Sequence, residues 1–248
     1  MEELEHSLAL VELFNRAFGK PLAALLGLFG TKTADPEHLV PDYIVMSLFV
    51  VVLLSLVLGL MSRKLDLVPT RRQSFLELLY GMFDGLVTDI IGPEGRKFLP
   101  VIGTVGIFVF TANMLGLLPG FMSPTSKLNV TLGCASVVFV YYHWQGMKAQ
   151  GALKYLKTFA GPIPAMAPLM FPIELISHFS RPVSLSMRLF GNIFAEDLLI
   201  VIIASIVPFI LPLPFMALSI FTAVIQSFVF VLLSCIYLAG AVAHEGEH

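Results

Sequence analysis

Long apolar runs dominate the chain, and most of its charged residues lie outside them. Five runs are long enough to enter a membrane: 43–61, 98–118, 128–144, 169–207 and 215–242. A helix needs about 20 mostly apolar residues to cross the hydrocarbon core of a bilayer. The pattern therefore predicts an all-α polytopic membrane protein with about five membrane-embedded helices.

The segment from Ser74 to Ile91 has a different pattern, because its polar and apolar residues fall on opposite sides of a helix. Glu77, Asp84 and Thr88 recur on one face, and bulky apolar residues cover the other. This spacing is typical of an amphipathic helix with a period near 3.6 residues. We expect it to lie along the membrane interface.

Basic residues gather in two loops, one after the first apolar run (Arg63, Lys64, Arg71, Arg72) and one after the third (Lys148, Lys154, Lys157). The positive-inside rule makes both loops cytoplasmic. The acidic segment 1–42 and the loop 119–127 are then external, and residues 43–248 form a single membrane domain. Five crossings from an outside N-terminus place the C-terminus in the cytoplasm.

The fourth run is too long to cross the membrane upright. A continuous helix over 169–207 would exceed about 50 Å, whereas the hydrocarbon core is about 30 Å thick. Pro182 is its one clear break signal, and proline in a membrane helix often causes only a kink. We expect this helix to tilt, bend or break, and to form a long, strongly tilted hairpin with the final run, from Leu169 to Val242.

Composition agrees with a membrane location. Hydrophobic residues make up 57% of the chain and charged residues 13%, whereas a soluble domain has about 25% charged residues. The mean hydropathy is +0.87. The two cysteines lie inside apolar runs and imply no disulfide framework. Gly103, Gly106 and Gly116 suit close helix packing in lipid.

The predicted hairpin contains few charged residues, and all of them lie in its first helix: Glu174, Arg181, Arg188, Glu196 and Asp197, with His178 as a possible sixth. An ionised group at membrane depth is costly and is by default a functional hypothesis. Arg188 cannot lose its proton, because the pKa of arginine lies above about 12. A permanent positive charge in an apolar interior is therefore the strongest functional signal in the chain.

Most polar residues of this helix fall on one stripe, at about 100° per residue: Glu174, His178, Arg181, Arg188, Asn192 and Glu196, with Leu185 between them. Asp197 lies about 180° round the helix from Arg188. Opposite faces would let Arg188 meet a partner while Asp197 lines a watery path. On the last helix Ser219, Thr222 and Gln226 form a second stripe, which we expect to face the first.

The chain resembles subunit a of the membrane sector of rotary F-type ATP synthases, most closely the bacterial and chloroplast forms. The likeness extends from Tyr43 to the C-terminus and is densest in SRPVSLSMRLFGNIFAEDL (180–198). NMLGLLP (113–119) and IQSF (225–228) support it. A motif of that length around an intramembrane arginine is highly specific.

The resemblance implies a role for each polar residue of the hairpin. Arg188 corresponds to the essential stator arginine, with Asn192 and Gln226 as its polar neighbours. Asp197 falls at an acidic or polar position of the outer half-channel, and Glu196 at a position often held by glycine or another acid. Ser219 stands where some members have a proton-relaying histidine, which argues against an identical external relay. Glu174 and Arg181 match polar positions on the cytoplasmic side.

The resemblance also implies what surrounds the subunit. A ring of small proteolipid (c) subunits, peripheral-stalk (b) subunits and the soluble F1 ATPase are its expected partners, in a bacterial inner membrane. Two offset half-channels would carry protons to and from the ring. No phosphate-binding glycine loop is present in the sequence, so nucleotide chemistry belongs to other subunits and the chain is no enzyme on its own. We expect no cofactor, no metal ion and no nucleic acid. The rotor carboxylates, which are not in this chain, decide between proton and sodium.

Several alternatives remain at this level. Arg188 in a structural ion pair with Glu196 or Asp197 would only help helices to pack. A secondary ion or solute transporter would use Arg188 as a counter-ion, although no repeated halves are visible. An intramembrane hydrolase would use Ser184 or Ser186 with His178. Glu174 and His178 fit either a cytoplasmic proton exit or an interfacial role, and Gln226 fits a plain interhelical hydrogen bond.

Overall fold

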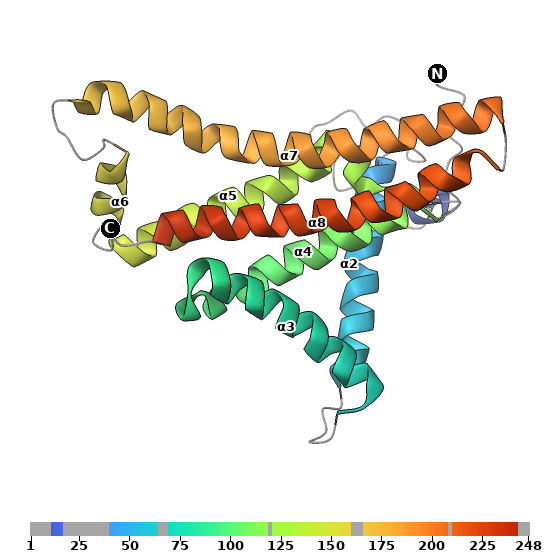
Figure 1. Ribbon diagram of the computed structural model, residues 1–248, viewed down its shortest axis with the longest axis horizontal. Coiled ribbons are helices and arrows are strands. Elements are labelled where there is room, and N and C mark those ends of the chain that lie inside the picture. Colours follow the sequence, from blue (N-terminus) through green and yellow to red (C-terminus); the bar gives the residue numbers. More distant parts are fainter. Residues whose placement is uncertain are drawn as a thin grey trace.

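A computed structural model describes residues 11–16, 40–63, 69–118, 121–159, 166–207 and 210–242, and every regular element in these ranges is helical. The elements are α2 (Asp42–Met61), α3 (Arg71–Ile91), η3 (Pro93–Phe98), α4 (Leu99–Leu115), η4 (Pro124–Ser126), α5 (Leu128–Gln150), α6 (Ala152–Thr158), α7 (Ala167–Ile206) and α8 (Pro212–Val242) (Figure 1). The predicted all-α class is confirmed. Most of the predicted external segment 1–42 lies outside the described residues.

Four of the described helices are long and apolar enough to cross a membrane: α2, η3 with α4, α7 and α8. They correspond to four of the five predicted crossings. The remaining one, α5, extends six residues beyond the predicted 128–144, and its second half contains Tyr141, Tyr142 and His143. Its packing against α7 and α8 keeps these polar residues inside the helical bundle. The crossing of the membrane by α5 stays a prediction.

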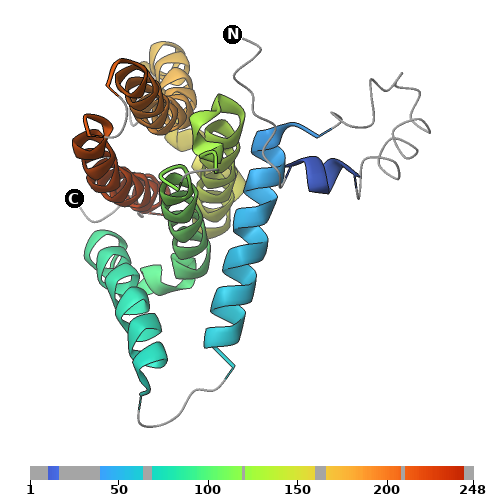
Figure 2. The ribbon, with the colours of Figure 1, turned by 90° about the vertical axis from the view of Figure 1, so that its right-hand side faces the viewer.

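The hairpin of α7 and α8 is antiparallel and is the longest feature of the molecule (Figure 1). α7 is one continuous helix of 40 residues with Pro172 and Pro182 inside it. The sequence predicted that this helix would tilt, bend or break, and the structure shows that it does not break. Both helices run crosswise to α2. α2 is upright in Figures 1 and 2, whereas α7 and α8 lie nearly horizontal in Figure 1 and are seen nearly end-on in Figure 2. Because the 20-residue α2 has the length of an upright crossing, the hairpin must be strongly tilted.

The core lies where α3, α4, α5, α7 and α8 meet. α7 contributes only one buried apolar stripe, formed by Leu185, Leu189 and Ile193, which recur at every fourth position. At Gly106 an added Cβ would lie 2.5 Å from Cγ2 of Val231, so the close packing predicted there is confirmed. At Gly103 a Cβ would meet nothing within 4 Å in the described part of this chain, so close packing there stays a prediction.

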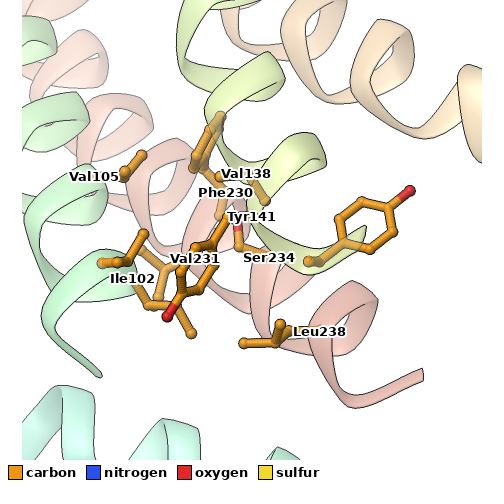
Figure 3. Close-up of a pocket in the computed structure, with 10 residues that line it drawn as sticks. Ile102, Val105, Val138, Tyr141, Phe230, Val231, Ser234 and Leu238 are labelled. Atoms are coloured by element: carbon orange, nitrogen blue, oxygen red, sulfur yellow. The ribbon is translucent and has the colours of Figure 1, made fainter. Parts of the chain in front are cut away.

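A small cavity between α4, α5 and α8 shows how closely these helices pack. Its volume is about 10 Å³, which leaves room for one water molecule at most. Figure 3 shows that apolar side chains such as Val105 and Leu238 surround it. Its one serine, Ser234, already donates a hydrogen bond to the carbonyl oxygen of Phe230 at 2.8 Å. This part of the bundle is a packed core and offers no aqueous path.

The predicted interfacial helix is present as α3, which begins three residues earlier than expected, at Arg71. It lies at the edge of the molecule (Figures 1 and 2) and exposes large apolar side chains, including Leu78 and Met82. Its Asp84 forms a bidentate ion pair with Arg96, both N–O distances being 3.0 Å. α3 ends at Gly92, whose φ of 96° favours glycine.

Candidate functional site

Arg188 lies near the middle of α7, on its outer surface. Leu185 and Leu189 on either side of it are buried in the core and fix the rotation of the helix, so that the guanidinium is exposed. Among the described residues, no hydrogen bond or ion pair involves Arg188. The alternative of a structural ion pair with Glu196 or Asp197 is therefore wrong for this part of the chain.

The surface next to Arg188 is built from small residues. Ser184, Gly191 and Ala195 are four before, three after and seven after the arginine, which places them on the same side of α7, and all three are exposed. A Cβ added at Gly191 would meet nothing within 4 Å. Another helix can therefore approach the backbone of α7 closely beside the guanidinium.

One turn further along α7, an amide pair joins the two helices of the hairpin. Nδ2 of Asn192 donates to Oε1 of Gln226 at 2.9 Å. Gln226 is only 3% exposed, and its own Nε2 has no hydrogen-bond partner among the described residues. The expected facing of the two polar stripes is confirmed here, and the hairpin holds a buried amide donor close to the arginine.

Glu196 continues the contact between the stripes. Its half-buried carboxyl group lies beside the hydroxyl groups of Ser219 and Thr222 on α8. Each hydroxyl also donates to a carbonyl oxygen one turn earlier, Ser219 to Phe215 at 3.0 Å and Thr222 to Leu218 at 3.1 Å. The structure thus brings together three of the residues that the sequence singled out.

Asp197 points the other way, toward η4, as its position on the helix predicted. The half-buried carboxyl group has the hydroxyl of Ser126 as a neighbour. A buried network continues from η4, with Thr125 donating to Oδ1 of Asn113 at 2.6 Å and Nδ2 of Asn113 donating to the hydroxyl of Ser227 at 3.3 Å. No sequence pattern pointed to the η4 residues, because they resemble those of any polar turn.

A second polar cluster lies toward the other end of α7. Nε2 of His178 is 3.2 Å from Oε1 of Glu174, one helical turn away. The hydroxyl of Tyr142 on α5 is 3.2 Å from Nδ1 of the same histidine. The guanidinium of Arg181 packs over the ring of Tyr237 on α8, 5.4 Å from its centroid. Tyr142 and Tyr237 were missed, because residues distant in sequence meet here only through helix packing.

The residues of the hydrolase alternative do not come together. Ser184 and Ser186 are six and eight residues from His178 on one continuous helix, which separates them by about 9 and 12 Å along the axis. The hydroxyl of Ser186 is buried and donates to the carbonyl oxygen of Val183 at 2.9 Å. No catalytic pair with His178 exists. Within the ranges described, no group of three or more His, Cys, Asp or Glu side chains is placed to hold a metal ion.

Comparisons with known proteins identify the family. The sequence profile of the ATP synthase A chain family matches residues 44–239. ATP synthase subunit a of Campylobacter jejuni subsp. doylei is 47% identical over 201 residues, which cover 80% of this chain and 89% of the relative. Those of Campylobacter fetus and a Sulfurihydrogenibium species are 43% and 40% identical over 84% of this chain, and over 92% and 99% of their own lengths. The chain therefore belongs to the family of ATP synthase subunit a.

Proposed function

We propose that Arg188 is the stator charge that controls proton exchange with the carboxylates of a rotor ring. As a subunit a, the chain is a non-catalytic membrane subunit of the H⁺-transporting ATP synthase and acts as a stator in proton translocation. The observation that carries the finer proposal is an exposed guanidinium without a partner among the described residues. The family also argues against an autonomous secondary transporter, because the relatives are subunits of a larger enzyme.

The chemistry of such an arginine follows from electrostatics. A rotor carboxylate at membrane depth faces lipid only in its neutral form. Next to Arg188 the ionised form is stabilised, so the carboxyl group gives up its proton there. The rotor group must therefore unload into one half-channel and reload from another. One proton moving down 100 mV supplies about 2.3 kcal/mol, and several such steps together drive nucleotide synthesis elsewhere.

The two polar clusters on α7 fit two offset half-channels. Glu174 and His178 lie 14 and 10 residues before Arg188, whereas Glu196 and Asp197 lie 8 and 9 residues after it. The first cluster is next to α5, which ends near the basic, cytoplasmic loop. The second touches η4 in the loop predicted to be external. We assign the outer path to Asp197, Glu196 and Ser219, and the cytoplasmic path to Glu174 and His178. Asn192 and Gln226 lie beside the arginine, between the two paths.

Two further surfaces fit the remaining membrane partners. The face of α7 around Gly191 suits a ring of small proteolipid hairpins, because it has room for a close helix. An open groove of about 440 Å³ between α2, α3 and α4 has mainly apolar walls, with Gln73, Glu77 and Thr104 on its polar side. A membrane helix of the peripheral stalk would fit it. We place the subunit in a bacterial inner membrane, with the N-terminus outside and the C-terminus in the cytoplasm, and F1 joined to it through stalk and ring.

The test is ATP-driven proton pumping in inverted membrane vesicles. Arg188→Ala should reduce pumping to background, because the rotor carboxylates no longer discharge at the stator. Co-isolation of the variant with the ring and with an active soluble ATPase shows that assembly has survived. Full pumping by an assembled Arg188→Ala complex would end the assignment.

A further inference from the structure

The cluster around His178 forms a chain of contacts in which each hydrogen atom can be assigned. Its members are Arg181, Tyr142, His178 and Glu174. The guanidinium of Arg181 is a neighbour of the Tyr142 hydroxyl. That hydroxyl lies 3.2 Å from Nδ1 of His178, and Nε2 of His178 lies 3.2 Å from Oε1 of Glu174. Tyr142 is fully buried, so none of its contacts is an incidental one at the surface.

The direction of the chain follows from the types of donor and acceptor. A guanidinium can only donate, so a hydroxyl beside it directs its hydrogen away, and the hydrogen of Tyr142 is directed at His178. Nδ1 of His178 then accepts, and in a neutral imidazole the other nitrogen, Nε2, must carry the hydrogen. The Nε2–H group is thus directed at the carboxylate of Glu174.

We propose that Arg181 and Tyr142 are positioning residues that hold His178 as a hydrogen-bond donor to Glu174. In this arrangement His178 does not relay the transported proton. Its Nε2–H group orients the carboxyl group of Glu174, and Glu174, whose side chain is 41% exposed, takes the proton and releases it to the cytoplasm. This inference rests on the proposed cytoplasmic half-channel and assigns a different task to each of its two residues.

The other groups around His178 belong in the same picture. His143 on α5 lies with its ring centroid 5.1 Å from that of His178, and its Nδ1 is 2.8 Å from the hydroxyl of Tyr155 on α6. Phe159 packs on the imidazole at 4.6 Å between centroids. From α8, the ring of Tyr237 packs on Arg181, and its centroid lies 6.2 Å from that of Tyr142. The only carboxylate within contact of His178 among the described residues is Glu174.

Two substitutions of His178 separate a donor from a proton carrier. Glutamine keeps an N–H donor at a similar reach but does not titrate, whereas leucine has neither property. His178→Gln should retain most ATP-driven pumping by the assembled complex, and His178→Leu should lose most of it. Equal loss in both variants would overturn the proposal, because a proton-carrying imidazole is then required. Normal pumping by both His178→Leu and Glu174→Gln would instead refute the cytoplasmic half-channel itself.

A second experiment tests the positioning residues through the pH profile of pumping. Tyr142→Phe frees Nδ1 of His178, so the imidazole can now take up a proton and the profile should change shape. The double variant Tyr142→Phe with His178→Gln should return to the profile of the unchanged protein, because glutamine does not titrate. Tyr141→Phe is the matched control, since its hydroxyl lies outside the chain of contacts. A Tyr142→Phe profile identical to that of the unchanged protein would contradict the proposal.

Discussion

Within two turns of α7, neighbouring residues have three different environments. Leu189 is packed in the core, Asn192 bonds across to α8, and Arg188 is exposed without a partner in the described part of the chain. A helix with a 100° step per residue produces this separation without irregular backbone. Burial of Leu185 and Leu189 therefore determines where the arginine points, which links core packing directly to the function proposed for the charge.

At the residue scale, the amide pair should be energetically coupled. Asn192→Ala leaves Gln226 with neither amide atom paired among the described residues, and loss of this bond should cost about 0.5–1.5 kcal/mol. Thermal unfolding of Asn192→Ala, Gln226→Ala and the double variant should give non-additive losses. Asn129→Ala, an exposed asparagine whose side chain bonds to Tyr43, is the control. Additive losses would mean that the pair does not act as a unit.

Asp197 should matter for transport less than Arg188 does. Asp197→Asn keeps the volume and the neighbouring Ser126 but removes the titratable group, so pumping should slow without stopping. Asp89→Asn, an exposed aspartate on α3, should leave the rate unchanged. The initial rates of ATP-driven acidification measure the difference. A normal rate for Asp197→Asn would remove this residue from the proton path.

At the scale of elements, two glycines of the membrane helices have opposite surroundings. A side chain at Gly191 has open space within this subunit, whereas one at Gly106 would collide with Val231. Gly191→Leu should therefore accumulate normally in the membrane but lose pumping, because it obstructs the approach of a rotor helix. Gly106→Leu should lower the amount of subunit itself. Immunoblots of membranes and pumping assays distinguish the two, and normal pumping by Gly191→Leu would contradict a ring on this face.

The elements also show how far the sequence can predict this fold. Periodicity predicted the helices and the facing of Glu196 by Ser219 and Thr222, because these properties depend on residues within one hairpin. The contacts of Tyr142 with His178 and of Ser126 with Asp197 were not predictable, since they depend on how α5 and η4 pack against α7. The beginning of α3 at Arg71 was missed because a polar first turn resembles a loop.

At the scale of the whole molecule, the hairpin lies crosswise to α2, so that one long helix presents residues along the membrane as well as across it (Figures 1 and 2). Glu174 and Glu196 are 22 residues apart on α7, about 33 Å along its axis, with Arg188 between them. This distance would give two half-channels a lateral offset as well as different depths. In the proposed mechanism, the tilt would therefore have a functional consequence that a hairpin of upright helices would lack.

The central claim is that the positive charge of Arg188 forces protons to travel with the rotor. It is tested most directly by passive proton conductance in vesicles stripped of F1, with one ring subunit cross-linked to the stator so that the rotor cannot turn. The unchanged protein should be proton-tight in this state, and Arg188→Ala should leak, because the charge that repels protons between the half-channels is gone. A stationary Arg188→Ala rotor that stays proton-tight, or an unchanged protein that leaks, would contradict the account.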